Sequence, residues 1–401
     1  MASLFTSLHP RVHGVTNHRG VFWSESEDED AVVGVLPERA TTLAESLRAA
    51  GYATAAFVSN PWLRAELGFG QGFDLYDDSH AESFTRDASP VPVEELTAAA
   101  RAWLESPEAR RPFFLYLHLM NVHNPYGLHA QRSDFDALAA SPAVASDQVL
   151  EESQTPHQRW PNMERRPEWA SDEMRREVSY WRTRYASGVR SLDRHLGAFL
   201  SYLRESDRLE DSYLVFTSDH GEELFEHGDW SHGKNLHAHQ LHVPLIVRTP
   251  GGRDGGRRID EIVDLIDLMP TFLSIAGGVS EPRSQGHDLS GFFAGETPQL
   301  PGVSVASATF LGPDQYAMRT RDHKLILDLE SGAAQLYDPL SDPREQRDQA
   351  GSPESAQVVD RLRQQLTRRI AESLAQGSLG SETTALPEGL KEQLEALGYG
   401  Q

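Results

Sequence analysis

The side chains most able to do chemistry lie between Leu214 and Pro244, in the sequence LVFTSDHGEELFEHGDWSHGKNLHAHQLHVP. An apolar, strand-forming run stops there at Asp219 and His220. Open α/β sheets bind their ligands at the carboxyl ends of such strands, and two ionisable groups would be costly there without a partner. Six histidines fall from His220 to His242, interleaved with Asp, Glu and Lys. This stretch therefore has the residue types to bind a divalent cation and an anion together.

Some of these histidines need no functional role. His237, His239 and His242 are more simply explained as solvated loop histidines, since isolated histidines are usually structural. His118 lies inside the apolar run PFFLYLHLMNVHNPY and is predicted to be packed.

These motifs resemble the sulfatases, a family within the alkaline phosphatase superfamily. Ser218 to Glu222 has the sequence SDHGE, similar to the family's second metal-binding motif, and an EHG turn and an LHVPLIVR strand follow in the family's order. The resemblance extends over most of residues 1 to 345. Its further matching segments are Ala2 to Thr6, His9-Pro10, His13 to Val15, Thr42 to Ala44, Ala50 to Ala55, Pro112 to Tyr126, Val263 to Thr271, Leu336 to Pro339 and Asp342-Pro343.

The resemblance implies roles for individual residues. Asp219 and His220 are expected to bind a divalent metal ion that polarises an ester oxygen. Calcium is favoured, while the imidazole ligand leaves manganese and zinc open. His123 is expected to donate a hydrogen bond to the ester or to protonate the leaving group. His232 and Lys234 are the candidates for placing positive charge on the non-bridging oxygens.

The usual beginning of a sulfatase has no counterpart in this sequence. The family normally starts with a strand that ends in two acidic metal ligands, followed by a C/S-x-P-S-R motif whose Cys or Ser becomes formylglycine. Met1-Ala2-Ser3-Leu4 would match the end of that motif, and the 401 residues contain no cysteine. We therefore expect Met1 to be an internal methionine of a longer reading frame, or the start of a truncated one. The chain as given is predicted to be inactive or nearly so.

Two departures from the family pattern leave the substrate open. The family's GKWH is replaced by Val58-Ser59-Asn60-Pro61, and the lysine after the EHG turn is replaced by His232. The predicted function is metal-dependent hydrolysis of a small-molecule or carbohydrate sulfate ester. The alternatives are a phosphoryl-transfer enzyme of the same superfamily, acting on phosphate or phosphonate esters, and a non-catalytic relative that binds anions.

Composition excludes several other classes of protein. The formal net charge is -23, from 37 Lys and Arg against 60 Asp and Glu. Nucleic acid is therefore not expected as a partner, because binding its phosphates requires clustered cations. A hydrophobic content of 39% is typical of a globular chain, and no apolar run approaches the roughly 20 residues that span a bilayer. Location is left open between cytoplasm and periplasm.

Apolar runs alternate with amphipathic segments, which is typical of an α/β fold with a mainly parallel sheet and helices on both faces. We expect a sulfatase-like domain over residues 1–300, with an insertion at about 127–180, and a small C-terminal α+β subdomain over residues 301–401. Asp219 and His220 are expected to end a central parallel strand, with a gap in the sheet beside it where the family's first strand is absent. The predicted strands are Thr54–Val58, Pro112–Leu119, Tyr213–Ser218 and Pro244–Thr249, and the predicted helices are Thr41–Ala50, Val93–Leu104, Arg182–Leu203 and Val263–Ala276.

Overall fold

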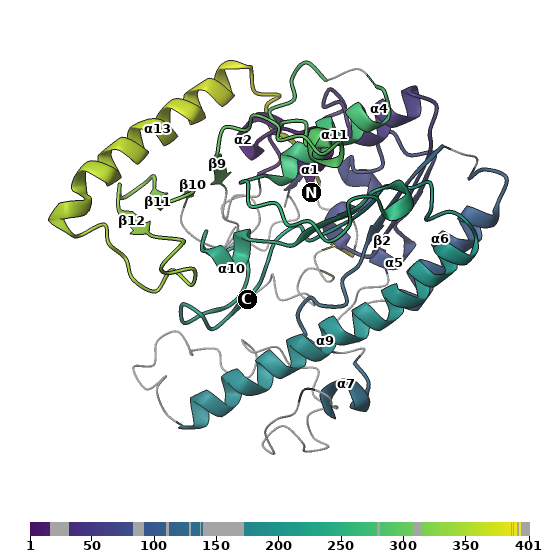
Figure 1. Cartoon of the computed structure of the whole chain (residues 1–401), viewed down its shortest axis with the longest axis horizontal. Coiled ribbons are helices and arrows are strands. Elements are labelled where there is room, and N and C mark those ends of the chain that lie inside the picture. Colours follow the sequence, from purple (N-terminus) through teal and green to yellow (C-terminus); the bar gives the residue numbers. More distant parts are fainter. Residues whose placement is uncertain are drawn as a thin grey trace.

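The computed structural model describes residues 1–16, 32–82, 92–109, 112–127, 130–136, 138, 172–278, 281–307, 314–385, 387, 389–390 and 393 (Figure 1). Its helices are α1 (Ala2–Thr6), α2 (Pro10–His13), α4 (Leu43–Ala49), α5 (Ser79–Glu82), α6 (Val93–Glu105), α7 (Arg132–Asp136), α9 (Asp172–Glu205), α10 (Ala238–Leu241), α11 (Leu268–Ile275), α12 (Ser290–Phe293) and α13 (Ala356–Ala375). Its strands are β1 (Val32–Val35), β2 (Ala53–Val58), β3 (Leu75–Asp77), β4 (Phe113–His118), β5 (Leu214–Thr217), β6 (Glu223–Leu224), β7 (Trp230–Ser231), β8 (Leu245–Arg248), β9 (Val303–Ser307), β10 (Gln315–Thr320), β11 (Lys324–Asp328), β12 (Ala334–Tyr337) and β13 (Glu382–Ala385).

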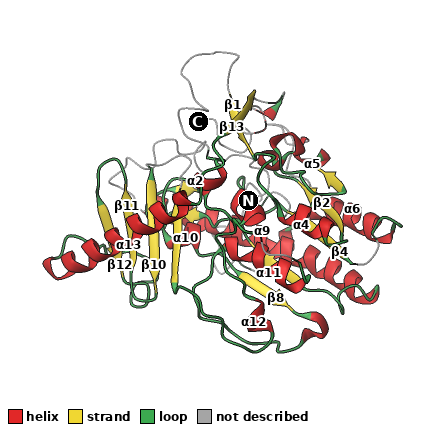
Figure 2. Cartoon of the chain, turned by 90° about the horizontal axis from the view of Figure 1, so that it is seen from above, coloured by secondary structure: helices red, strands yellow, loops and turns green. Residues whose placement is uncertain are grey.

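A parallel sheet with strand order β3-β2-β4 forms the centre of the N-terminal part. The buried side chains of β2 alternate between its two faces: Ala53, Ala55 and Phe57 pack in one hydrophobic cluster and Ala56 in another. Helices α6 and α9 contribute to the first cluster, and α1, α4 and α11 to the second (Figure 2). The predicted α/β fold, with helices on both faces of a parallel sheet, is confirmed.

Local sequence signals fix the position of α4 on this sheet. Thr42 and Glu45 form a capping box, in which each side chain accepts a hydrogen bond from the backbone N–H of the other. The loop before β3 packs directly on this helix start: a Cβ added to Gly72, at φ +87°, would lie 2.1 Å from the backbone nitrogen of Glu45. Glycine is therefore the residue that allows the close approach.

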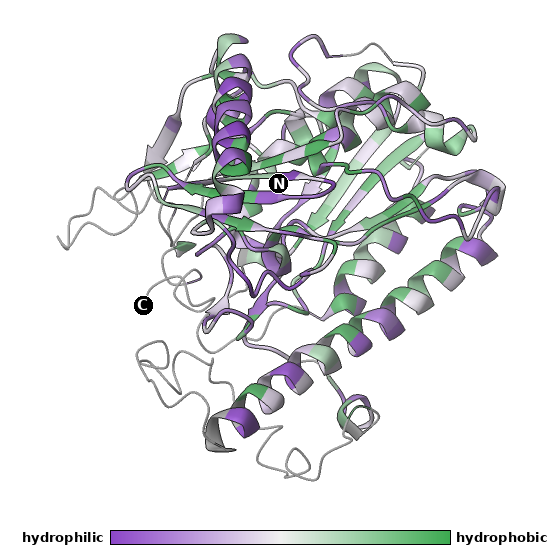
Figure 3. Cartoon of the chain, turned by 60° about the vertical axis from the view of Figure 1, so that its left-hand side comes forward, coloured by the Kyte–Doolittle hydropathy of each residue, from purple (hydrophilic) through white to green (hydrophobic). Residues whose placement is uncertain are grey.

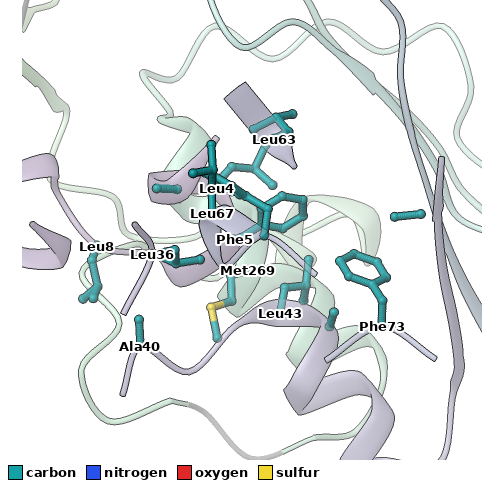
Figure 4. Packing of buried hydrophobic residues seen from close by; sticks show 14 of the residues in the cluster. Leu4, Phe5, Leu8, Leu36, Ala40, Leu43, Leu63, Leu67, Phe73 and Met269 are labelled. Atoms are coloured by element: carbon teal, nitrogen blue, oxygen red, sulfur yellow. The ribbon is translucent and has the colours of Figure 1, made fainter. Parts of the chain in front are cut away.

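Helix α1 is part of the main core (Figure 4). Phe5 is fully buried, and its ring packs edge-on against Phe73 and Tyr116 at centroid distances of 6.1 and 4.9 Å. Leu43 of α4 and Met269 of α11 belong to the same cluster. Loss of a buried aromatic side chain of this kind costs about 3–5 kcal/mol, so α1 is a substantial source of stability for this layer.

The strand that carries Asp219 does not belong to the parallel sheet. β5 pairs antiparallel with β8 in a separate two-stranded sheet, so the prediction of a central parallel strand at this position is wrong. The physical reason lies in the connection between them. The chain passes through the β6–β7 hairpin and the one-turn helix α10, whereas parallel neighbours are usually joined by a long crossover helix.

Within the described ranges no ladder joins β4 to β5, and the gap expected beside this strand stays a prediction. Phe216 and Ile246 are register partners in the β5–β8 pair, and they are 40% and 59% exposed. One face of the pair therefore leaves apolar side chains uncovered.

The C-terminal part contains an antiparallel sheet of order β12-β11-β10-β9 (Figures 1 and 2). Helix α13 covers one face, where Leu366 packs in a cluster with Met318 and Leu325. The opposite face carries Ile326, which packs in a cluster with Leu236, just ahead of α10. The sheet thus supports the segment that follows the candidate site. Strand β13 returns to pair with β1, and the division of the chain at residue 300 stays a prediction.

Much of the predicted insertion at about 127–180 lies outside the described residues. The predicted helix Arg182–Leu203 is confirmed as part of the longer α9. Figure 3 shows hydrophobic and hydrophilic residues alternating along this helix, and Phe199 and Leu203 from its apolar side pack with the sheet. Within the described part of the chain, none of the helices has the length and apolar content to span a bilayer.

Candidate active site

Asp219 and His220 follow β5 directly. Because a carbonyl only accepts hydrogen bonds, His220 Nδ1 donates to the Gly221 oxygen at 2.8 Å, and Nε2 lies 3.8 Å from Asp219 Oδ2. The turn is fastened to α10, since Gly221 N–H donates to the Gln240 carbonyl. A Cβ added to Gly221 would lie 2.0 Å from the His239 carbonyl oxygen, so this position requires glycine.

Three histidines from separate segments meet at this loop. The ring centroid of His123 lies 5.1 Å from that of His232, which in turn lies 4.0 Å from that of His220. His123 and His232 are both buried. The expected convergence of His123 and His232 on the loop of Asp219 is therefore observed.

Glu222 completes this group, and the sequence analysis assigned it no role. Its side chain is 7% exposed, and Oε1 lies 3.2 Å from His232 Nδ1. Burial raises the pKa of Glu222 to about 7, although His123 and His220 act in the opposite direction. The signal that could have singled it out was its place in SDHGE, two residues after His220 in the same turn. We refer to Asp219, His220, Glu222, His123 and His232 as the site cluster.

The electrostatics of the site cluster are uneven. Burial, with His232 as the second cause, lowers the pKa of His123 to about 4. Burial and His220 hold the pKa of His232 well below its ordinary value. The pKa of Asp219 is lowered despite its burial, because His220 and His118 face it. The site thus combines an ionised carboxylate with two neutral imidazoles.

Lys234 lies beside the site cluster. Its Nζ is 2.5 Å from Asp229 Oδ1, and its side chain is one-fifth exposed. The positive charge of Lys234 contributes to the low pKa of His232. The structure therefore brings Lys234 into the electrostatic surroundings of His232, with Asp229 as its ion-pair partner.

A second group of polar side chains lies between the site loop and the C-terminal sheet. We call it the support cluster, and its members are Glu223, His227, Asn235, His237, His239, Lys324 and Glu345. Glu223 accepts hydrogen bonds from Asn235 Nδ2 at 2.8 Å, His239 Nε2 at 3.1 Å and the backbone N–H of His227 at 2.9 Å. Burial alone would raise its pKa, but these donors, His239 above all, lower the pKa of Glu223 to about 2.

Glu345 joins this cluster to the C-terminal sheet. It accepts hydrogen bonds from Lys324 Nζ at 2.8 Å, His237 Nδ1 at 3.0 Å and the Ala238 N–H at 2.9 Å. Despite burial, these donors lower the pKa of Glu345 to about 2. The start of α10 is thereby fixed on β11.

The histidines of the support cluster form a stack. The rings of His227 and His237 are nearly parallel, with 9° between their planes and 3.7 Å between their centroids. The centroid of the His239 ring lies 5.1 Å from that of His227. Burial, followed by the two neighbouring imidazoles, lowers the pKa of His227 to about 4. His237 and His239 are thus largely buried and paired with Glu345 and Glu223, so the prediction that they are solvated loop histidines is wrong.

The donor set of Asp219 and His220 suits a divalent cation. An imidazole whose Nδ1 donates to a carbonyl oxygen directs the lone pair of Nε2 outward, which is the usual arrangement of a metal-binding histidine. Asp219 supplies an ionised carboxylate. In the regions that the structure describes, no three His, Cys, Asp or Glu side chains are arranged to hold one metal ion. The pair therefore fits a cation only as part of a shell that other ligands or water complete.

Comparison with known proteins decides the family. Residues 1–279 match the family model described as Sulfatase. The chain belongs to the sulfatase family. Residues 225–372 also match the model described as N-sulphoglucosamine sulphohydrolase, C-terminal. The two matches overlap over residues 225–279, which include His227, Asn235, His237 and His239 of the support cluster.

The sequence identity between this chain and individual sulfatases is low. Arylsulfatase K of Xenopus laevis is 28% identical over 296 residues, which cover 65% of this chain and 53% of that relative. The chain thus spans about half the length of the curated relatives it matches. A solved structure in complex with its substrate D-glucosamine-2-N,6-O-disulfate gives a TM-score of 0.68 at 19% identity, covering 94% of this chain and 87% of the other. The phosphonate monoester hydrolase of Silicibacter pomeroyi gives 0.65 at 19% identity, covering 96% and 89%. At these identities the two structures establish the shared fold.

Proposed function

We propose that this chain acts in the metal-dependent hydrolysis of sulfate esters whose alcohol part is a small molecule or a carbohydrate. The observation that carries the proposal is the convergence of His123 and His232 on the loop of Asp219 and His220. Membership of the sulfatase family supports the reaction class. The disulfated glucosamine bound by a relative of the same fold supports a carbohydrate ester as one form of the substrate.

Asp219 and His220 are the proposed metal ligands. A divalent cation there would polarise an ester oxygen and stabilise the negative charge that develops on it. Calcium is the proposed ion because carboxylate oxygen is its preferred ligand, and the imidazole keeps manganese and zinc as alternatives. The low pKa of Asp219 keeps its carboxylate ionised and available to a cation at neutral pH.

His123 is the proposed proton-transfer group. Its Nδ1 donates to the Asn124 carbonyl at 2.7 Å, so the neutral ring carries its lone pair at Nε2. A proton taken up at Nε2 can be returned to the leaving oxygen, and the low pKa of His123 makes the protonated ring a strong acid. Lys234 and His232 are proposed to lie at the non-bridging oxygens, where Lys234 supplies positive charge.

We also propose that the 401-residue chain turns over esters slowly or not at all, because it contains no C/S-x-P-S-R motif. The test is to measure both turnover and binding of p-nitrophenyl sulfate, p-nitrophenyl phosphate and a phosphonate monoester, each with calcium, manganese and zinc. Calcium-dependent binding of the sulfate ester is expected, with loss of binding in Asp219→Ala. His242→Ala, at an exposed position, is the control that should bind normally.

Two results would contradict these proposals. Stronger binding of the phosphate or phosphonate ester than of the sulfate ester would favour phosphoryl transfer. Turnover by the 401-residue chain that Asp219→Ala abolishes would show that the nucleophile lies within these residues.

A further inference from the structure

We propose that Gln240 is a positioning residue, which holds the turn of residues 231–234, with His232 and Lys234, against the loop of Asp219. One buried side chain thereby sets the distance between the proposed metal ligands and the groups that contact the ester. The inference rests on the proposed function, because it concerns the same site and the same ester.

Gln240 lies in the one-turn helix α10 and contacts both segments. Its backbone carbonyl accepts a hydrogen bond from the Gly221 N–H at 2.8 Å, and its side-chain Oε1 accepts one from the Gly233 N–H, also at 2.8 Å. Gly221 directly follows His220, and Gly233 directly follows His232. A single residue therefore binds the backbone next to a proposed metal ligand and the backbone next to a proposed ester contact.

The side chain of Gln240 is suited to hold a fixed geometry. It is 4% exposed, so water competes little for the hydrogen bond with Gly233. Because the Gly233 N–H is a donor, the atom that it contacts is the amide oxygen. Nε2 of Gln240 is buried and has no hydrogen-bond partner among the residues that the structure describes. A side chain of the same size without an acceptor therefore removes this one hydrogen bond and no other.

The turn depends on outside contacts because its backbone is strained. Ser231 and Gly233, on either side of His232, have φ angles of +74° and +79°, in the left-handed region. Glycine adopts this region readily, whereas a serine there costs free energy and persists only where surrounding contacts hold it. On one side, the β6–β7 ladder pairs Ser231 with Glu223. On the other side, Gln240 holds Gly233, so that His232 is fixed between two anchored residues.

Helix α10 is itself fixed, so it can position both segments. The Ala238 N–H at its start donates to Glu345 at 2.9 Å, and Glu345 is bound to Lys324 of β11. The Gly221 backbone packs so closely on this helix that an added Cβ would lie 2.0 Å from one of its carbonyl oxygens. Gln240 therefore places the 231–234 turn relative to the C-terminal sheet as well as to the site loop.

The first test is hydrogen exchange of the backbone amides, measured by 15N NMR of the 401-residue chain in EDTA. We expect the Gly233 N–H to be protected in the wild type. In Gln240→Met, which keeps the size of the side chain but removes the acceptor, this N–H should exchange about tenfold faster or more. The Gly221 N–H should stay protected in the same variant, because its acceptor is a backbone carbonyl.

Two further variants serve as controls for this measurement. Gln240→Glu should keep the Gly233 N–H protected, because a carboxyl oxygen can accept the same hydrogen bond. Gln346→Met is the same substitution at an exposed glutamine, which donates to the Glu226 carbonyl, and it should change the exchange of neither glycine.

The second test measures ligand binding by calorimetry. In Gln240→Met, the affinity for calcium should change by less than about twofold, since Asp219 and His220 keep their positions. The affinity for p-nitrophenyl sulfate in the presence of calcium should fall by about tenfold, because His232 and Lys234 lose their alignment. A general loss of structure lowers both affinities together, so the two measurements separate positioning from folding.

An unprotected Gly233 N–H in the wild type would overturn the proposal, and this measurement needs no variant to fold. Unchanged exchange in a folded Gln240→Met protein would also overturn it, as would an ester affinity that does not fall or that falls equally with the calcium affinity. The outcome is separate from that of the proposed function. A wild type that binds no sulfate ester, with Gly233 protected as expected, would count against the function and leave the role of Gln240 in holding the turn intact.

Discussion

The site cluster and the support cluster both contain carboxylates and histidines, yet the pKa of Glu222 in the first shifts in the opposite direction from those of Glu223 and Glu345 in the second. In the support cluster, Glu223 and Glu345 each accept several N–H donors, and the pKa of each carboxyl is lowered to about 2. In the site cluster, burial raises the pKa of Glu222 to about 7. A buried carboxylate surrounded by donors stabilises a fold, whereas one with a raised pKa among neutral imidazoles is typical of a functional site.

The difference follows from where the donors come from. Lys324 on β11 and the N–H of Ala238 at the start of α10 converge on Glu345 from two directions, so desolvation of the carboxylate is offset. Around Glu222 the nearby ionisable groups include the imidazoles of His123, His220 and His239 and the carboxylate of Asp219, which itself raises the pKa of Glu222. A cation and an anionic ester at Asp219 and His220 would change that balance, which links ligand binding to the stability of the site cluster.

The largest expected effect on stability follows the removal of a buried carboxylate that accepts several hydrogen bonds. Glu345→Gln should lower the free energy of unfolding by about 3–5 kcal/mol, because it leaves the buried Lys324 without its counter-charge. Urea titration followed by circular dichroism measures this change. Glu210→Gln is the matched control at an exposed ion pair with Arg248, where less than about 1 kcal/mol is expected. Equal effects at the two positions would remove the distinction between buried and exposed carboxylates.

In the site cluster, removal of a carboxylate is expected to raise the free energy of unfolding at neutral and higher pH. Because the folded pKa of Glu222 lies near 7, above its ordinary 4.5, its stabilising contribution is complete below pH 4.5 and is lost as the pH rises to 7. Glu222→Gln has no charge to bury, so in EDTA it should be more stable than the wild type by about 3 kcal/mol above pH 7 and nearly equal below pH 4.5. Thermal or urea unfolding across this range tests it, and a difference that does not vary with pH would contradict the raised pKa.

The effect of substitutions on metal affinity should also distinguish the two clusters. Asp219→Ala or His220→Ala should weaken binding of calcium, manganese or zinc by about tenfold or more, and the wild-type chain itself should bind weakly because two protein ligands are few. His239→Gln is the control in the support cluster. Calorimetric titration measures all four proteins, and a greater loss of affinity in His239→Gln than in Asp219→Ala or His220→Ala would place the metal in the support cluster.

The smallest expected effect concerns the histidine stack. The pKa of His227 is lowered to about 4 from its ordinary 6.5, so its contribution to stability is present above pH 6.5 and is lost as the pH falls to 4. Between pH 6.5 and pH 4, the free energy of unfolding of His227→Gln should therefore fall by about 1 kcal/mol less than that of the wild type. This value allows for the partial exposure of the His227 side chain. A parallel loss of stability in both proteins would show that His227 does not titrate in this range.

Much of the fold followed from local sequence patterns. The apolar run of β2, the capping box before α4 and the amphipathic pattern of α9 each depend on residues close together in sequence, and the predicted elements were confirmed there. The same is true of the motif that contains Asp219 and His220, because residue type and spacing are both local. The direction of β5 was not predictable in this way, since its partner depends on how the chain returns from α10.

The sequence by itself determined the family, the parallel sheet and the candidate residues Asp219, His220, His123, His232 and Lys234. Only the tertiary structure decided which charged groups are satisfied. His237 meets Glu345 from 108 residues away, while Glu222 is left to a single imidazole contact at 3.2 Å. Burial and partner geometry set the pKa of a carboxyl, and both arise from contacts between distant segments that no local pattern specifies.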